Sequence, residues 1–374
     1  MRTMKNDNNM NVVDLLLKLL SFKSLTPDDD GSLKFIEEYL EGYGALYVNK
    51  EGVKNLFLVK KFGNGPHVCF AGHVDVVPAG DKWDTNPFVP VIKEGNIYGR
   101  GAQDMKSGVA AFVQTCKETE HFNGTLSVLL TSDEEGEGKY GTAVMLEHLK
   151  AEGMLPDYCI VAEPTCETTF GDAIKIGRRG SINGYLTIQG KQGHAAYPEK
   201  AINPVHQIAS ILDKIAGVNL DNGDDDFSPS QMVITDIRGG MEVTNVTPGS
   251  LKLMFNVRNS TKTTQEEVRL HIDKCFQGLD YALELTQGSY PFVTTRDSKV
   301  VQKLRESIKN VTDVETKLST AGGTSDARFM GAFGIDVVEF GVINDTIHAP
   351  NERTSIVEVE QLCEVFQALV KDFN

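Results

Sequence analysis

The chain has 374 residues and a mass of 41.0 kDa, which is more than one hydrophobic core usually serves, so we expect two domains. Its 37 Lys and Arg residues against 52 Asp and Glu residues give a formal charge of −15. That charge repels phosphate backbones and anionic membrane surfaces, so neither a nucleic acid nor a membrane is expected as a partner.

The apolar runs of the sequence are far shorter than the roughly 20 residues that cross a bilayer. The first ten residues are polar and lack the small-residue cleavage site of a secretory signal, so we expect a frayed extension on a cytoplasmic protein. Six widely spaced cysteines form no C-x-x-C pair and are expected to be reduced core residues: Cys69, Cys116, Cys159, Cys166, Cys275 and Cys363.

In the first half of the chain, helical and extended patterns alternate. We expect helices at 15–20, 33–43, 107–119 and 142–149, and strands at 55–59, 67–71, 125–131 and 157–162. Apolar strands that alternate with helices are typical of a helix-flanked, largely parallel sheet.

The segment 180–292 follows a different order. Strands are expected at 181–188, 231–237, 250–257 and 281–285, and helices at 203–216 and 264–279. This β-α-β-β-α-β order is typical of a ferredoxin-like unit, which can close by itself. The acidic stretch 222–226 inside it is interpreted as a solvated loop in preference to a cation site.

The last 80 residues return to the first pattern, with a helix expected at 299–311, a strand at 336–340 and a final helix from residue 357. The predicted fold is therefore α/β, with a mostly parallel sheet formed by residues 1–179 and 293–374. The ferredoxin-like domain, residues 180–292, is inserted into it.

One motif suggests a nucleotide-binding site. Residues 136–141 satisfy G-x-G-x-x-G between an expected strand and an expected helix, as a dinucleotide fingerprint requires. The strand, however, leads into Asp133, Glu134 and Glu135, and Glu137 lies in the loop, so a pyrophosphate would face carboxylates where it needs bare amides. A non-enzymatic dinucleotide-binding module is kept as a distant alternative.

Carboxylates and imidazoles at the ends of several expected strands suit a metal ion better. Such ligands without thiolates favour zinc, cobalt or manganese, and the carboxyl ends of strands in an open α/β sheet converge on one crevice. Most of these candidates, taken alone, are more often ordinary surface residues, and for Asp104 a helix cap is an equally good interpretation. The candidates are His73, Asp75, Asp104, Glu134, Glu135, Glu163 and His348.

Two pairs of candidates have informative spacing. His73 and Asp75 are two residues apart, so on an extended segment both face one side and Asp75 could hold the imidazole from behind. Glu134 and Glu135 would repel each other at the end of a buried strand unless a cation relieves them. On an extended chain they point to opposite sides, so one can bind metal while the other reaches a water.

Together the motifs at 73–78, 99–106, 131–135 and 163–164 resemble the dinuclear zinc amidohydrolases and aminopeptidases. That family includes the aminoacylases, the acetylornithine deacetylases and the succinyl-diaminopimelate desuccinylases. The resemblance covers nearly the whole chain in the same order, and the motifs at 177–181, 190–198, 203–206 and 322–329 resemble the desuccinylase branch.

The resemblance implies two divalent metal ions, with zinc favoured and cobalt or manganese as alternatives. Asp104 would bridge them, His73 and Glu163 would complete one site, and Glu135 and His348 the other. It further implies that Glu134 is the general acid and base, that Asp75 orients His73, and that the peptide between Asp104 and Met105 is cis.

The activity implied is hydrolysis of N-succinyl-L,L-2,6-diaminopimelate to succinate and L,L-2,6-diaminopimelate, a step of lysine and diaminopimelate biosynthesis. A sister deacylase acting on acetylornithine or another N-acyl amino acid is the nearer alternative. The inserted domain would form a homodimer and place His194 in the other subunit's site. The substrate, a small polycarboxylate amino acid, would contact Arg178, Tyr197, Asn245, Arg258, Thr324 and Asn344, since guanidinium groups match carboxylates.

Overall fold

A computed structural model describes residues 10–373, so the expected frayed extension lies almost wholly outside the described residues. The chain divides into two compact units. The larger unit comprises Met1–Gly177, Thr294–Ser319 and Ser325–Asn374, and the smaller unit comprises Arg178–Val293 and Thr320–Thr324.

An eight-stranded sheet forms the centre of the larger unit. Its order is β1 (Gly44–Tyr47), β2 (Asn55–Lys61), β6 (Thr125–Thr131), β3 (His67–His73), β7 (Tyr158–Val161), β18 (Asp336–Glu339), β8 (Ala173–Lys175), β17 (Lys317–Ser319). The central strand β3 runs parallel to both β6 and β7, and β7 runs parallel to β18. This arrangement confirms the expected mostly parallel sheet, with antiparallel neighbours at β1, β2 and β8.

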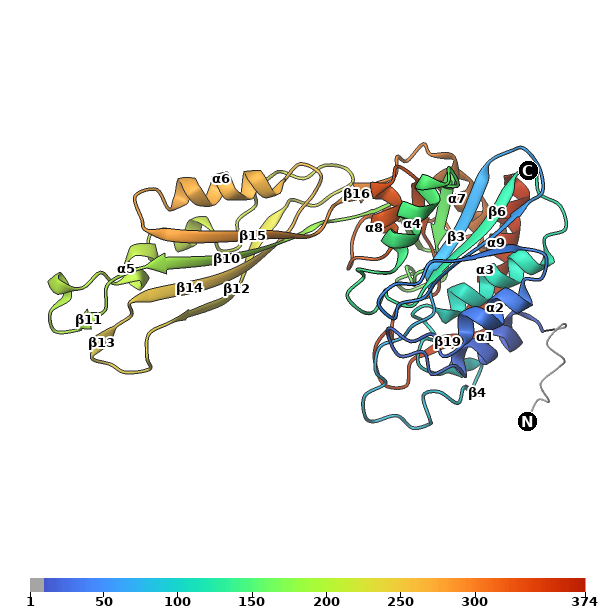
Figure 1. Cartoon of the computed structure of the whole chain (residues 1–374), viewed down its shortest axis with the longest axis horizontal. Helices are drawn as coiled ribbons and strands as arrows, with labels where there is room; N and C mark the ends of the chain where they lie inside the picture. Colours follow the sequence, from blue (N-terminus) through green and yellow to red (C-terminus); the bar gives the residue numbers. More distant parts are fainter. Residues whose placement is uncertain (1–9, 374) are drawn as a thin grey trace. The chain divides into compact units, whose positions relative to one another are not determined.

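Helices cover both sides of this sheet (Figure 1). One group comprises α1 (Val12–Leu20), α3 (Lys106–Glu118), α7 (Lys299–Thr312) and α9 (Ile356–Asp372), with α2 (Ser32–Tyr39) nearby, and the other comprises α4 (Thr142–Ala151) and α8 (Ala327–Ala332). The ring of Phe70 on β3 lies 5.8 Å from Phe112 of α3 and 5.1 Å from Phe366 of α9, centroid to centroid. These buried rings join the first and last segments of the chain in one core.

A smaller sheet of the larger unit orders the loops around residue 100. It consists of β4 (Val91–Lys93), β5 (Asn96–Tyr98) and β19 (Arg353–Ser355), with β5 in the middle. Both pairs are antiparallel. The pairing of β5 with β19 brings the segment that follows Tyr98 beside the segment that precedes Arg353.

The smaller unit contains a four-stranded antiparallel sheet. Its order is β12 (Gln231–Gly239), β14 (Ser250–Arg258), β10 (Ser181–Gln189), β15 (Tyr281–Ser289), and its helices are α5 (Pro204–Ile208) and α6 (Gln265–Cys275). Short pairs are formed by β11 (Gly193–His194) with β13 (Val246–Thr247) and by β9 (Gly177–Arg178) with β16 (Phe292–Val293). The strand order is that of a ferredoxin-like unit, which confirms the predicted fold class.

The prediction of one helix at 203–216 is only partly correct. The helix α5 ends at Ile208, and a short 3₁₀ turn, Leu212–Lys214, follows. Ile208, Ile211 and Ile215 are buried, so the periodicity correctly indicated an inward face. The backbone nevertheless tightens to i+3 hydrogen bonds, because the Ile211 N–H donates to the Ile208 carbonyl and the Lys214 N–H to the Ile211 carbonyl.

Two further expectations concern the chain as a whole. All six cysteines are free and five of them are buried, as predicted. Among residues 10–373, no helix combines the length and the apolar character that crossing a membrane requires.

Candidate active site

The candidate residues of the larger unit converge because the strands that carry them are neighbours. His73 is the last residue of β3, Glu134 and Glu135 follow β6, and Glu163 follows β7. Since β3 is parallel to β6 and β7, the carboxyl ends of all three strands meet at one edge. Asp104 reaches the same place from the loop before α3.

Asp104 lies between two histidines. Its Oδ1 is 3.1 Å from Nε2 of His73, and its Oδ2 is 3.1 Å from Nε2 of His348. Ligand atoms of His73, Asp104 and Glu163 lie within 4.8 Å of one another, and so do those of Asp104, Glu135 and His348. One carboxylate therefore belongs to two potential metal-binding groups, with one oxygen facing each histidine.

The second group is closed by a contact between distant parts of the chain. Nε2 of His348 lies 3.0 Å from Oε1 of Glu135. His348 has a φ of +59°, in the left-handed region, so the loop after β18 turns sharply where it presents this imidazole. The side chain of His348 is about half-exposed, whereas those of Glu135 and Asp104 are nearly buried.

The contact between His73 and Asp75 differs from the simplest expectation. Nδ1 of His73 lies 2.9 Å from the backbone carbonyl oxygen of Asp75 and 3.5 Å from its Oδ1. Oδ2 of Asp75 accepts a hydrogen bond of 3.2 Å from the backbone N–H of Glu135. Asp75 thus lies behind His73, but its backbone makes the shorter contact, and its carboxylate helps to fix the loop of Glu135.

Glu134 and Glu135 lie in a turn after β6, not on extended chain, so the expectation that they point to opposite sides is wrong. Both reach the cluster: ligand atoms of His73, Glu134 and Glu135 lie within 4.8 Å of one another. Oε2 of Glu134 is 3.9 Å from Nε2 of His73. Burial raises the pKa of Glu134 to about 8; nearby His73 lowers it, and Asp326, Asp104 and Glu135 raise it further.

Other groups of the cluster are also perturbed. Burial raises the pKa of Glu163 well above its usual range. Burial alone would lower the pKa of His73, but hydrogen bonds with Asp104 and Asp75 raise the pKa of this imidazole well above its usual value. Hydrogen bonds to Asp104 and Glu135 raise the pKa of His348 to about 10. Burial tends to raise the pKa of Asp104, yet its two histidine contacts bring it below the usual range.

These residues fit a pair of divalent cations. The cluster holds four carboxylates, Asp104, Glu134, Glu135 and Glu163, against two imidazoles, and it lies in a largely buried place. Burial disfavours the ionised form of Glu134 and Glu163, and the neighbouring carboxylates add to this effect, so the pKa values of both groups are raised. Oxygen and imidazole donors without thiolate match zinc, cobalt or manganese.

Sequence reasoning missed Asp326, a carboxylate near this cluster. Asp326 is buried, and its Oδ2 accepts a 2.6 Å hydrogen bond from Oγ1 of Thr142 at the start of α4. Burial raises the pKa of Asp326, and its charge in turn raises that of Glu134. It lies in the motif 322–329 that carries the resemblance, so its place in that motif was the signal available.

Three predicted residues of the smaller unit lie together. His194 on β11 pairs with Val246 of β13, and the backbone N–H of Ala195 donates to the carbonyl of Asn245 at 2.9 Å. The rings of His194 and Tyr197 are 5.8 Å apart, centroid to centroid. Nδ1 of His194 accepts a hydrogen bond of 3.0 Å from the N–H of Ala196, which leaves Nε2 directed away from that turn.

The remaining predicted substrate contacts are dispersed. Arg178 is buried, its Nη1 donates to the carbonyl of Ala321 at 3.2 Å, and Thr324 lies in the same segment of the smaller unit. Arg258 is exposed at the end of β14. Asn344 is exposed in the larger unit, on the loop that leads to His348.

The glycine-rich loop 136–141 has its own internal contacts. Oδ2 of Asp133 accepts a hydrogen bond of 2.9 Å from the N–H of Tyr140, directly before the N-terminus of α4. A pyrophosphate at this position would meet a carboxylate that already binds the loop, so the geometry favours the metal cluster over a dinucleotide.

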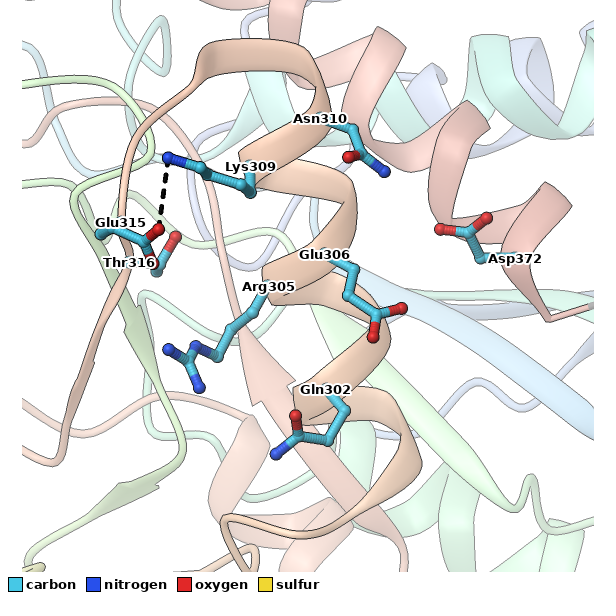
Figure 2. A pocket seen from close by; sticks show the side chains of 8 residues that line it. All are labelled: Gln302, Arg305, Glu306, Lys309, Asn310, Glu315, Thr316 and Asp372. Atoms are coloured by element: carbon cyan, nitrogen blue, oxygen red, sulfur yellow. Dashed lines mark ion pairs between the residues drawn. The ribbon is translucent and has the colours of Figure 1, made fainter.

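A separate surface hollow of about 450 Å³ lies along α7 in the larger unit (Figure 2). Its charges are mixed: Arg305 and Lys309 accompany Glu306, Glu315 and Asp372. Nζ of Lys309 pairs with Glu315 at 3.2 Å and with Asp313 at 2.9 Å. The hollow contains no histidine and none of the predicted site residues.

Residues 69–372 match the sequence model of the peptidase family M20/M25/M40. The chain belongs to this family. The family resemblance drawn from the motifs is thereby confirmed.

Curated relatives in this family are similar over nearly their whole length. A succinyl-diaminopimelate desuccinylase of a Sulfurovum species is 70% identical over 365 residues, which cover 98% of this chain and 100% of that protein. A protein of the same name from a Nitratiruptor species is 64% identical over 364 residues, covering 97% of this chain and 100% of that one.

Solved structures in the M20 family share the fold. Aminopeptidase PepT from Bacillus cereus superposes with a TM-score of 0.80 at 19% identity, covering 99% of both chains. The Bacillus subtilis YXEP protein, described as a dinuclear metal binding peptidase of this family, gives 0.70 at 15% identity and covers 96% of both chains.

Proposed function

We propose that this M20-family chain is a metal-dependent amide hydrolase that converts N-succinyl-L,L-2,6-diaminopimelate and water to succinate and L,L-2,6-diaminopimelate. The observation that carries the chemistry is Asp104, whose two oxygens each lie 3.1 Å from a different histidine. The substrate is supported by relatives of 61–70% identity that bear the name succinyl-diaminopimelate desuccinylase.

The five proposed ligands divide into two sets. His73, Asp104 and Glu163 would hold one divalent cation, and Asp104, Glu135 and His348 the other, with zinc favoured over cobalt or manganese. When bound, two such cations lower the pKa of a water and polarise the scissile carbonyl. The excess of carboxylates over imidazoles supplies the negative charge that this pair of cations requires.

Glu134 is the proposed general base. Its carboxylate lies 3.9 Å from Nε2 of His73 and belongs to neither of the two proposed ligand sets. It would take the proton from the attacking water and then deliver it to the leaving amine.

The smaller unit would supply recognition. We propose a homodimer in which His194 of the partner subunit donates a hydrogen bond to the developing oxyanion. Arg178 and Arg258 would bind substrate carboxylates, and Tyr197, Asn245, Thr324 and Asn344 would add hydrogen bonds. A cytoplasmic location stays a prediction from the sequence.

A two-substrate assay tests this proposal. Purified protein is incubated with succinyl-diaminopimelate or with acetylornithine, each after chelation and again after zinc is restored, and release of the free amine is followed. We expect faster turnover of the succinyl compound, loss of turnover with chelator and recovery with zinc. A preference for acetylornithine would reassign the substrate, and activity that resists chelation would overturn the metal mechanism.

A further inference from the structure

A buried ion pair lies beside the candidate metal centre in the larger unit. Glu352 is completely buried, Arg100 is 1% exposed, and Nη1 of Arg100 donates to Oε2 of Glu352 at 2.6 Å. The two residues are 252 positions apart in the chain and are joined by the pairing of β5 with β19. Burying two charges is costly unless further hydrogen bonds satisfy them, so their remaining partners matter.

Glu352 binds the loop that ends in Asp104. Its Oε1 accepts the backbone N–H groups of Gln103 at 2.8 Å and Asp104 at 3.1 Å, and its Oε2 accepts that of Gly101 at 3.0 Å. Gly101 has a φ of +87°, so the loop makes here a turn that other residues rarely adopt. Three backbone donors therefore converge on one carboxylate at the proposed bridging ligand and directly before it.

Arg100 binds the loop of His348. Its Nη2 donates to the backbone carbonyl of His348 at 3.2 Å and to that of Ala79 at 3.2 Å, in the loop that follows His73 and Asp75. Gln103 adds a parallel link, because its Nε2 donates to Oδ1 of Asp345 at 2.6 Å and its Oε1 accepts the N–H of Thr346 at 2.9 Å. One ion pair thus ties together the loops that carry Asp104 and His348 and the loop that follows His73.

We infer that Arg100 and Glu352 are positioning residues of the metal centre: they hold Asp104 through its backbone N–H and His348 through its backbone carbonyl. Asp104 Oδ2 and His348 Nε2 are 3.1 Å apart. This spacing depends on the position of the two loops relative to each other. Outer partners that fix ligands commonly change metal affinity by about 10- to 100-fold when they are removed. The inference rests on the proposed two-metal function and specifies what sets the spacing of its ligands.

The test is zinc binding to chelator-stripped, full-length protein, measured by titration calorimetry without substrate. Glu352→Gln keeps the shape but replaces one acceptor oxygen by an amide NH₂, so two of the four hydrogen bonds meet a donor instead. We expect zinc affinity about 10- to 100-fold weaker than that of the wild type. Arg100→Lys keeps the charge, loses the forked geometry, and should weaken binding by a smaller factor.

Asp221→Asn is the matched control. Asp221 also accepts four hydrogen bonds that fix loops, from the backbone N–H groups of Gly223 and Ser230 and the hydroxyls of Ser260 and Thr263, but it lies in the smaller unit. The Asp221→Asn variant should have a lower melting temperature and an unchanged zinc affinity.

Tryptophan fluorescence gives a second readout on the same samples, because Trp83 is the single tryptophan and its ring lies 5.3 Å from the Arg100 guanidinium carbon. Glu352→Gln should shift its emission, and Asp221→Asn should not.

Unchanged zinc affinity in a folded Glu352→Gln variant would overturn the inference. If that variant does not fold, Arg100→Lys decides: weaker binding supports the inference, and wild-type binding overturns it. A wild-type protein that binds no divalent metal would instead overturn the proposed function and the inference together, so the two failures are distinguishable.

Discussion

Two acidic regions of this molecule have similar residues and opposite surroundings. In the strand-end cluster of the larger unit, Glu134 and Glu163 are buried near other carboxylates, and burial raises the pKa of both. In the loop of the smaller unit, residues 221–226, Asp221 accepts four hydrogen bonds from the protein, and the pKa of Asp221 lies below its usual range.

The difference shows what distinguishes a metal site from an acidic loop. Around Asp221 the protein supplies the donors, so its carboxylate is stable as an anion without help. In the strand-end cluster, carboxylates face imidazoles and one another, and a dication would supply the missing positive charge. Acidity in the sequence is common to both regions, whereas the balance of donors and acceptors separates them.

The largest effect should come from Glu134→Gln. The variant keeps the size of the side chain but cannot accept a proton, so we expect turnover to fall by about 10²- to 10⁴-fold. Metal content, measured by atomic emission, should stay at the wild-type level. Glu137→Gln, an exposed neighbour on the same loop, is the control and should keep near-normal turnover. A Glu134→Gln variant with wild-type turnover would remove the general base from the mechanism.

Glu135→Gln should act on metal binding. Its carboxylate lies 3.0 Å from His348 Nε2, in one of the two proposed ligand sets only. One of two zinc equivalents should therefore bind more weakly, by more than the roughly 10- to 100-fold that is lost with an outer partner. Calorimetric stoichiometry separates this outcome from a general loss of affinity. The corresponding change in the acidic loop, Asp224→Asn, should leave the affinity of both zinc equivalents unchanged. Equal effects of the two variants would contradict the distinction between a metal site and an acidic loop.

Asp221→Asn should act on stability alone. Each hydrogen bond to a charged acceptor contributes modestly, and the loss of part of this network should lower the free energy of unfolding by ~1–3 kcal/mol. Urea unfolding monitored by circular dichroism measures the change. If the variant instead lost metal, the acidic loop would have to be reconsidered as part of the site.

Much of this picture could be predicted from the sequence. The strand ends at His73, Glu135 and Glu163 could be placed because each follows an apolar run, and neighbouring parallel strands must end at one edge. His348 was harder to place from its residues, because its loop follows β18 without a distinctive spacing. For that residue the family resemblance supplied the interpretation.

Other features could not be predicted from local patterns. The pair of Arg100 and Glu352 depends on a β5–β19 contact between residues about 250 positions apart, and periodicity says nothing about such pairings. The shorter contact of His73 with the Asp75 backbone, not its carboxylate, depends on how the chain turns after β3. The end of α5 at Ile208 could not be predicted, because the 3₁₀ turn that follows has nearly the same spacing of apolar residues as an α-helix.

The smallest effect concerns pH. In chelator-treated protein the pKa of Glu134 is raised to about 8, so its contribution to stability is fully present below about 4.5 and is lost as the pH rises toward 8. Gln at this position is neutral throughout. The melting temperature of Glu134→Gln minus that of the wild type should therefore increase between pH 5 and pH 8, as scanning calorimetry can measure.

The acidic loop should give the opposite result in the same experiment. The folded-state pKa of Asp221 is depressed, so its contribution is present above the unfolded value of 3.8 and is lost only when the pH falls below it. The difference between Asp221→Asn and the wild type should thus stay constant from pH 5 to pH 8. Adding zinc should flatten the Glu134 difference, because cations at the cluster favour the ionised carboxylate. A pH-dependent difference in melting temperature for Asp221→Asn, or a constant difference for Glu134→Gln, would contradict this explanation. The two regions would then not be separated by the hydrogen-bond donors that the protein supplies to their carboxylates.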